Sequence, residues 1–144
     1  MKLEDIFSIW KIDSKIDDTD LTNEAGKTPE LHAKYYELYS NENLIYQKLE
    51  HDLNKLYKLK SEYYFGKLST QELKENGWEP FELKILRQDI DTYMKADQDL
   101  IDMMLKIALQ KEKVDTLKDI IKQIHTRNFA IKNMIDYLKF SSGF

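Results

Sequence analysis

The sequence predicts an all-α protein built from long amphipathic helices. Only four Gly and two Pro occur among its 144 residues, so few positions interrupt a helix. Apolar residues make up 42% of the chain and charged residues 33%, a balance too apolar for a disordered chain. Apolar residues also recur at steps of three, four and seven, as they do along one face of a helix. This spacing favours a helical hairpin or a coiled-coil-like homo-oligomer.

Two short helices are expected before the first long one. The first carries a single apolar stripe formed by Leu3, Ile6, Phe7 and Trp10. The second spans 20–25, with N-cap oxygens available from 17–19 before it and Gly26 suited to end it.

The first long helix is expected to begin at Thr28 and to continue to Gly66. Thr28 can cap a helix and Pro29 is preset for its first position. Beyond Gly66, the sequence Ser69-Thr70-Gln71-Glu72 is a capping box that begins a short helix, and Asn76-Gly77 ends it.

A second long helix is expected from about Leu83 to Phe140, a stretch without Gly or Pro, with a possible break at 125–128. Its apolar stripe must be covered, either by self-association or by packing within a hairpin. The predicted oligomerisation residues on it are Ile107, Val114, Leu117, Ile121, Ile124, Ile131 and Leu138.

Several classes of protein are not supported by the sequence. The absence of Cys excludes disulfides, thiolate metal sites and a Cys nucleophile, and it fits a reducing compartment. No signal peptide, membrane-spanning stretch, nucleotide-binding loop, metal-ligand spacing or catalytic motif is recognisable. We therefore expect neither an enzyme nor a protein with a cofactor, metal or membrane partner.

The net charge of -4 argues against nucleic-acid binding, but the charge is unevenly distributed. Residues 1–30 carry eight acids and four bases, whereas 47–67 carry five bases and three acids. Residues 106–144 carry eight bases and four acids. Two locally basic segments are thus hidden in an acidic chain.

The first basic segment interleaves cations with aromatic residues. Ammonium groups neutralise phosphates, and aromatic rings provide stacking surfaces for unstacked bases. The alternative interpretation is structural, because Lys is favoured at a helix C-terminus and the tyrosines could pack in a core. The candidate DNA-binding residues are Lys58, Lys60, Tyr63, Tyr64 and Lys67.

A second candidate is the segment 127–132. Arg127 and Lys132 could contact DNA or a partner protein, whereas Phe129 and Ile131 suggest instead a helix junction that packs in the core.

Taken in order, several segments resemble the UvsY family of recombination mediators of tailed phages. Lys58-x-Lys60-x-Glu62-Tyr63-Tyr64-x-Gly66 is similar to the DNA-binding motif of that family, with Lys60 where a relative has Arg. Arg127-x-Phe129-Ala130-Ile131-Lys132 is similar to its C-terminal signature. The segment 68–125 matches poorly.

The resemblance implies a non-enzymatic, all-α homo-oligomer, ring-like and of six or seven subunits, in the cytoplasm of an infected host cell. Such a protein binds single-stranded DNA without sequence preference. It also contacts a RecA-type recombinase and a single-strand-binding protein, and it helps load the recombinase. The alternative from another class is a coiled-coil scaffold that does not bind nucleic acid.

This interpretation divides the chain into three parts. Residues 1–67 would form a helical DNA-binding part, 68–82 a hinge, and 83–144 a helical oligomerisation part.

Overall fold

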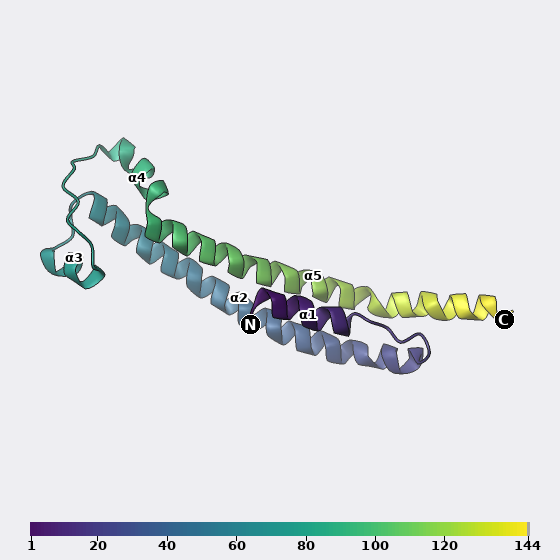
Figure 1. The fold of residues 1–144 in the computed structure, drawn as a ribbon. Coiled ribbons are helices and arrows are strands. Elements are labelled where there is room, and N and C mark those ends of the chain that lie inside the picture. Colours follow the sequence, from purple (N-terminus) through teal and green to yellow (C-terminus); the bar gives the residue numbers. More distant parts are fainter. Residues whose placement is uncertain (144) are drawn as a thin grey trace. The chain divides into compact units, whose positions relative to one another are not determined.

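The computed structural model describes residues 1–143 and confirms the all-α prediction (Figure 1). Its two long helices, α2 and α5, contain 44 residues each. None of the helices in this part of the chain has the length and apolar character needed to cross a membrane. The elements in chain order are α1 (Leu3–Asp13), α2 (Leu21–Tyr64), α3 (Thr70–Asn76), the 3₁₀ helix η1 (Arg87–Asp89), α4 (Ile90–Ala96) and α5 (Gln98–Ser141).

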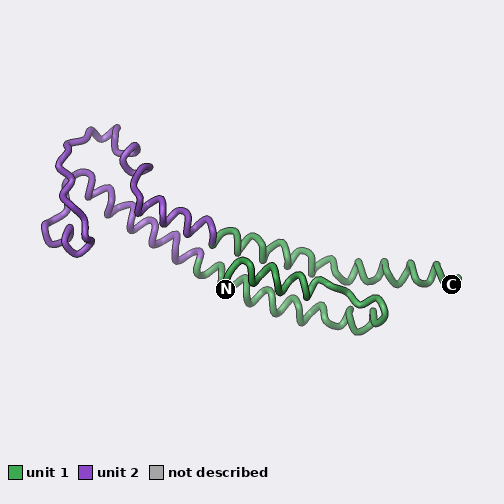
Figure 2. Tube along the Cα trace, viewed as in Figure 1, with its two compact units in different colours: residues 1–45, 110–144 green, residues 46–109 purple. Residues whose placement is uncertain are grey.

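The chain forms two compact units (Figure 2). The first combines Met1–Ile45 with the chain from Gln110 onward, so it contains α1, the beginning of α2 and most of α5. The second is Tyr46–Leu109, which contains the end of α2, then α3, η1 and α4, and the first turns of α5. The first unit therefore combines the N-terminal segment of the chain with its C-terminal segment.

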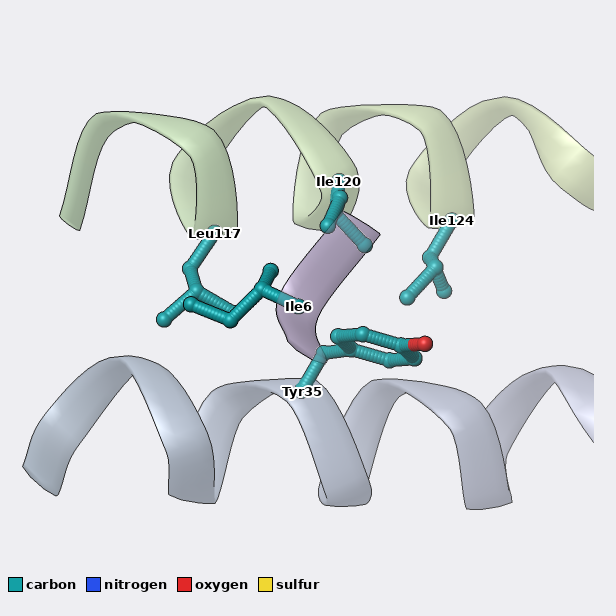
Figure 3. Close-up of a cluster of buried hydrophobic side chains, with 5 residues drawn as sticks. All are labelled: Ile6, Tyr35, Leu117, Ile120 and Ile124. Atoms are coloured by element: carbon teal, nitrogen blue, oxygen red, sulfur yellow. The ribbon is translucent and has the colours of Figure 1, made fainter. Parts of the chain in front are cut away.

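The core of the first unit is shared by three helices (Figure 3). Ile6 of α1, Tyr35 of α2 and Leu117, Ile120 and Ile124 of α5 are all at most 4% exposed. The three α5 residues are spaced by three and four, so they lie on one face of that helix. Within this unit α1 and α2 thus cover the part of the predicted α5 stripe that contains Leu117 and Ile124.

Buried polar contacts fix the antiparallel pairing of α2 and α5 in this unit. Near one end, the Gln110 side-chain amide donates to the Glu42 backbone carbonyl (2.8 Å) and carboxylate (2.6 Å). Near the other end, Arg127 contacts Glu24. A lower number on α2 faces a higher number on α5, as an antiparallel pair requires.

Asp13 at the end of α1 ties that helix to α2. Its carboxylate accepts hydrogen bonds from Lys34 (2.6 Å) and from the Tyr35 hydroxyl (2.8 Å). Burial raises the pKa of Asp13, but these two hydrogen bonds outweigh it and hold the pKa below its usual value.

The prediction of a short helix that ends at Gly26 is wrong, because α2 begins at Leu21 and runs through both Gly26 and Pro29. Gly weakens a helix interior, and Pro29 has no N–H to donate. Contacts from α5 support this weak beginning, since Arg127 donates to the Glu24 backbone carbonyl and to the Thr28 hydroxyl.

The prediction of a helix break at 125–128 is also wrong, because α5 is continuous from Gln98 to Ser141. The interruption lies instead at Asp97, whose ψ of 124° is extended and separates α4 from α5. The segment before it is not the start of one long helix, since 83–86 is non-helical and is followed by η1 and α4.

The local stop and start signals of the middle segment are confirmed. Ser69 and Glu72 form the predicted capping box at the start of α3. Gly77 ends α3 in the left-handed conformation, with φ 70°. The division of the chain into a DNA-binding part (1–67), a hinge (68–82) and an oligomerisation part (83–144) stays a prediction.

Candidate nucleic-acid interface

The segment that interleaves cations and aromatics lies at the C-terminal end of α2, in the second unit. α2 ends at Tyr64, and Gly66 follows with φ 71°. The Lys67 amide donates to the Glu62 carbonyl (2.9 Å), which closes a Schellman-type cap. Because consecutive residues of a helix are rotated by about 100°, neighbours in this segment point to different sides.

Two of the five predicted DNA-binding residues are cations that face solvent. The Lys58 side chain is 80% exposed, and its ammonium lies 3.9 Å from the Glu62 carboxylate. An exposed pair of this kind contributes at most about 1 kcal/mol, so it leaves Lys58 available to a phosphate. Lys67 is also exposed, and its ammonium lies 5.7 Å from the centroid of the Phe65 ring.

Lys60 is placed differently, because its side chain is only 5% exposed. Its ammonium lies 3.0 Å from the Asp97 carboxylate and 2.7 Å from the Asp99 carboxylate. It also lies 3.9 Å from the centroid of the Trp78 ring, a cation–π contact. In this structure, therefore, Lys60 holds the start of α5 to the end of α2.

Asp97 is the centre of this contact. Its carboxylate accepts from the Tyr64 hydroxyl (2.6 Å) and caps α5 by accepting from the Leu100 amide (3.0 Å). Burial raises the pKa of Asp97, but the hydrogen bonds from Tyr64, Leu100 and Lys60 outweigh it and hold the pKa below its usual value. Burial raises the pKa of Tyr64, and the hydrogen bond to Asp97 raises it further, so the phenol stays protonated at neutral pH.

Tyr63 and Tyr64 belong to an aromatic cluster inside the second unit. The Tyr64 ring lies 4.9 Å from Phe81 and 5.7 Å from Tyr93, measured between ring centroids. The Tyr63 ring lies 5.3 Å from Trp78, and its hydroxyl donates to the Glu79 carbonyl (2.6 Å). Both tyrosines are thus held by their neighbours, as the structural interpretation of the segment expects.

The second predicted segment lies in the first unit. Arg127 is buried, and its guanidinium donates to the Glu24 carboxylate (2.6 Å) and to the Thr28 hydroxyl (2.7 Å). Lys132 is exposed. Of the two proposed contacts in this segment, only Lys132 presents its charge to solvent.

The predicted oligomerisation stripe is largely buried within the chain. Val114, Leu117, Ile124 and Ile131 are at most 3% exposed, because the hairpin covers them within the single chain. Ile107 and Ile121 are half-buried. Only Leu138, at 46%, is substantially exposed.

The sequence reasoning missed Asp97 and Trp78. A local signal for Asp97 exists, because Asp three residues before the apolar Leu100 is a common helix start. Trp78 carries no such signal, since its contact with Lys60 joins two segments that are separated by the loop after α2 and by α3.

Comparisons with known proteins match nearly the whole chain to one protein family. The model of the family described as "Recombination, repair and ssDNA binding protein UvsY" matches residues 9–144. A curated relative, "Recombination protein uvsY" of Enterobacteria phage T4, is 27% identical over 143 residues, which is 99% of each chain.

Two crystal structures of the bacteriophage T4 recombination mediator protein UvsY, in different lattices, each have a TM-score of 0.84 and 24% identity. The first match covers 99% of this chain and 98% of the other, and the second covers 97% and 99%. At this level of identity the likeness establishes the fold.

Proposed function

The chain belongs to the UvsY family of recombination, repair and single-stranded-DNA-binding proteins, and from this premise we propose how it binds DNA. It is a recombination mediator and not an enzyme. The family match over residues 9–144 carries this conclusion. The finer proposal concerns the residues that contact DNA, the partners and the assembly.

We assign the phosphate contacts to the exposed cations near the end of α2. Lys58 belongs to the family-like motif and Lys67 directly follows it, and the ammonium groups of both face solvent. Phosphate contact needs an accessible positive charge and releases counterions, so binding should weaken steeply as salt rises.

The members of the motif that contact other parts of the second unit would then act as a scaffold. Lys60 and Tyr64 both bind Asp97, and Tyr63 binds the loop at Glu79. These contacts hold the end of α2 against the start of α5. An intact scaffold keeps the two exposed cations at a fixed place on the surface.

The partners follow from the role of a mediator. We propose that the chain helps load a RecA-type recombinase onto DNA that is covered by a single-strand-binding protein. A mediator must hold DNA and later release it, so several weak contacts suit this task better than one tight site. Multiplying a weak cationic site by the number of subunits gives avidity without a strong single contact.

Changing Lys58 to Ala should weaken DNA binding without weakening the fold. The side chain is 80% exposed, so the substitution removes a cation near the DNA and little packing. Because one phosphate is no longer neutralised, the slope of log affinity against log salt should become shallower by about 0.7. Fluorescence anisotropy of a labelled oligo(dT), titrated at several salt concentrations, measures both affinity and slope.

Lys11→Ala is the matched control, because Lys11 is an exposed cation on α1 in the other unit. Its binding curve should match that of the unchanged protein. Equal reductions in affinity for both variants would mean that binding reflects diffuse charge and not the end of α2. An absence of salt-sensitive binding in the unchanged protein would favour a helical scaffold that does not contact nucleic acid.

We further propose a homo-oligomer assembled through the exposed apolar side chains at the end of α5. Tyr137 is 69% exposed, Leu138 46% and Phe140 82%. Contiguous exposed apolar residues mark interaction surfaces. Ile124, by contrast, is 1% exposed, so a charge introduced there would disrupt the core of the first unit and not an interface.

Leu138→Asp should lower the mass of the particle in sedimentation velocity, because it places a charge in the proposed interface. Leu86→Asp is the control, since Leu86 is exposed to a comparable degree (64%) but lies in the second unit. It should leave the mass unchanged. A Leu138→Asp particle of unchanged mass would rule out this interface.

A further inference from the structure

A pocket of about 470 Å³ lies beside the end of α2. Two segments of the second unit line it, the helix end at Tyr64–Gly66 and the non-helical stretch after Pro80. Its size falls in the range of small-ligand sites. The lining residues are Tyr64, Phe65, Gly66, Phe81, Glu82, Leu83, Lys84 and Ile85.

Two aromatic residues of the lining are held in place. The Tyr64 and Phe81 rings pack edge to face at 4.9 Å, and Asp97 fixes the Tyr64 hydroxyl at 2.6 Å. The Phe81 ring also packs edge to face on Tyr93 at 5.4 Å. The aromatic lining therefore exists before any ligand arrives, which reduces the entropic cost of binding.

Cations flank this aromatic lining. Lys84 belongs to the lining and is exposed, and the Lys67 ammonium lies 5.7 Å from the Phe65 ring. Lys58, also exposed, lies on α2 six residues before its last residue, Tyr64, which is about 9 Å along the helix axis. The lining contains one acid, Glu82, which is exposed.

We propose that this pocket receives an unstacked base of single-stranded DNA, with Lys67 and Lys84 contacting the adjacent phosphates. The inference rests on the proposed function and adds a base site to its phosphate contacts. Aromatic faces accept any base, which suits binding without sequence preference. An apolar side chain of a protein partner would fill the aromatic part of the pocket but would leave the flanking cations without acceptors, so DNA fits the whole site better.

The test compares two oligomers of equal length, labelled oligo(dT) and an abasic strand that has phosphates but no bases. Phe65→Leu keeps an apolar side chain but removes the aromatic face. It should weaken oligo(dT) binding by about fivefold or more and leave abasic binding unchanged. Phe129→Leu, at a 66% exposed aromatic residue on α5, should change neither.

Because Phe65 is half-buried, a second measurement uses the unchanged protein. Iodouracil-substituted oligo(dT) is cross-linked by light, and the modified residues are identified by mass spectrometry. Cross-links at Tyr64, Phe65 or Phe81 would support the base site, and cross-links only elsewhere would overturn it.

The outcomes separate the two levels of the proposal. Binding of neither oligomer by the unchanged protein would defeat the proposed function itself. Equal affinities of the unchanged protein for the two oligomers would leave DNA binding in place and overturn the base site. Equal weakening of both by Phe65→Leu would also overturn it, and the pocket would then be a candidate site for a protein partner.

Discussion

Replacing Lys60 with Met is expected to lower the free energy of unfolding by about 3 kcal/mol. The substitution keeps an apolar stem of similar length but leaves Asp97 without its cation in a largely buried position. Breaking a buried ion pair from one side costs roughly 3–5 kcal/mol. We expect the lower end, because Asp99 on the other side of Lys60 is 51% exposed. Urea unfolding followed by circular dichroism measures the change.

Two controls distinguish this explanation from a loss of packing. Asp99→Asn should lower the free energy of unfolding by less than about 1 kcal/mol, since its carboxylate is half exposed.

The second control is the pH dependence. Folding lowers the pKa of Asp97, so the stability that this carboxylate contributes is present above its unfolded pKa of about 3.9. That stability is lost as the pH falls through the lower, folded pKa. The difference between Lys60→Met and the unchanged protein should therefore shrink in strong acid. A difference that stays constant with pH would point to packing.

A loss of stability in Lys60→Met would also change how DNA-binding variants of this segment are interpreted. A double Lys58→Ala, Lys60→Ala variant combines the removal of a surface charge with damage to the scaffold. Lys58→Ala alone tests the phosphate contact, and Lys60→Met alone tests the scaffold.

Replacing Arg127 with Met is expected to cause the second large effect, a loss of thermal stability. The guanidinium donates to the Glu24 carboxylate, to the Glu24 backbone and to Thr28, at the helix start that contains Gly26 and Pro29. Its removal should lower the thermal midpoint by roughly 5 °C or more. Hydrogen exchange should also become faster in 21–28, because these amides are then no longer supported by α5.

Arg127→Lys should recover only part of this stability, since Lys keeps the charge but lacks the planar fork that reaches several acceptors. Lys132→Met is the surface control and should leave the midpoint nearly unchanged. A midpoint that does not move in Arg127→Met would show that the beginning of α2 is stable without this contact.

Much of the fold could be predicted because its signals are local. The capping box at Ser69 and the stops at Gly66 and Gly77 depend on atoms within a few residues of one another. The helical character of the long segments follows from their spacing and from the scarcity of Gly and Pro. Gly26 could not be placed correctly in this way, because contacts from α5 outweigh its local preference.

The candidate site was predicted only in outline. The sequence places Lys58 and Lys60 two residues apart, with the same charge and similar neighbours. The structure exposes Lys58 and buries Lys60, because the start of α5 and Trp78 cover one side of α2. Which side is covered depends on residues nearly forty positions away, at Asp97 and Asp99.

By itself, the sequence determined the helical class, the helix stops at Gly66 and Gly77, the absence of Cys chemistry and the ordered motifs that resemble the family. Only the tertiary structure decided which cations face solvent, that Arg127 supports a helix start, and that Asp97 separates α4 from α5. The physical reason is the range of the interactions. Helix formation and capping act over three or four residues, whereas burial and ion pairing join residues that only folding brings together.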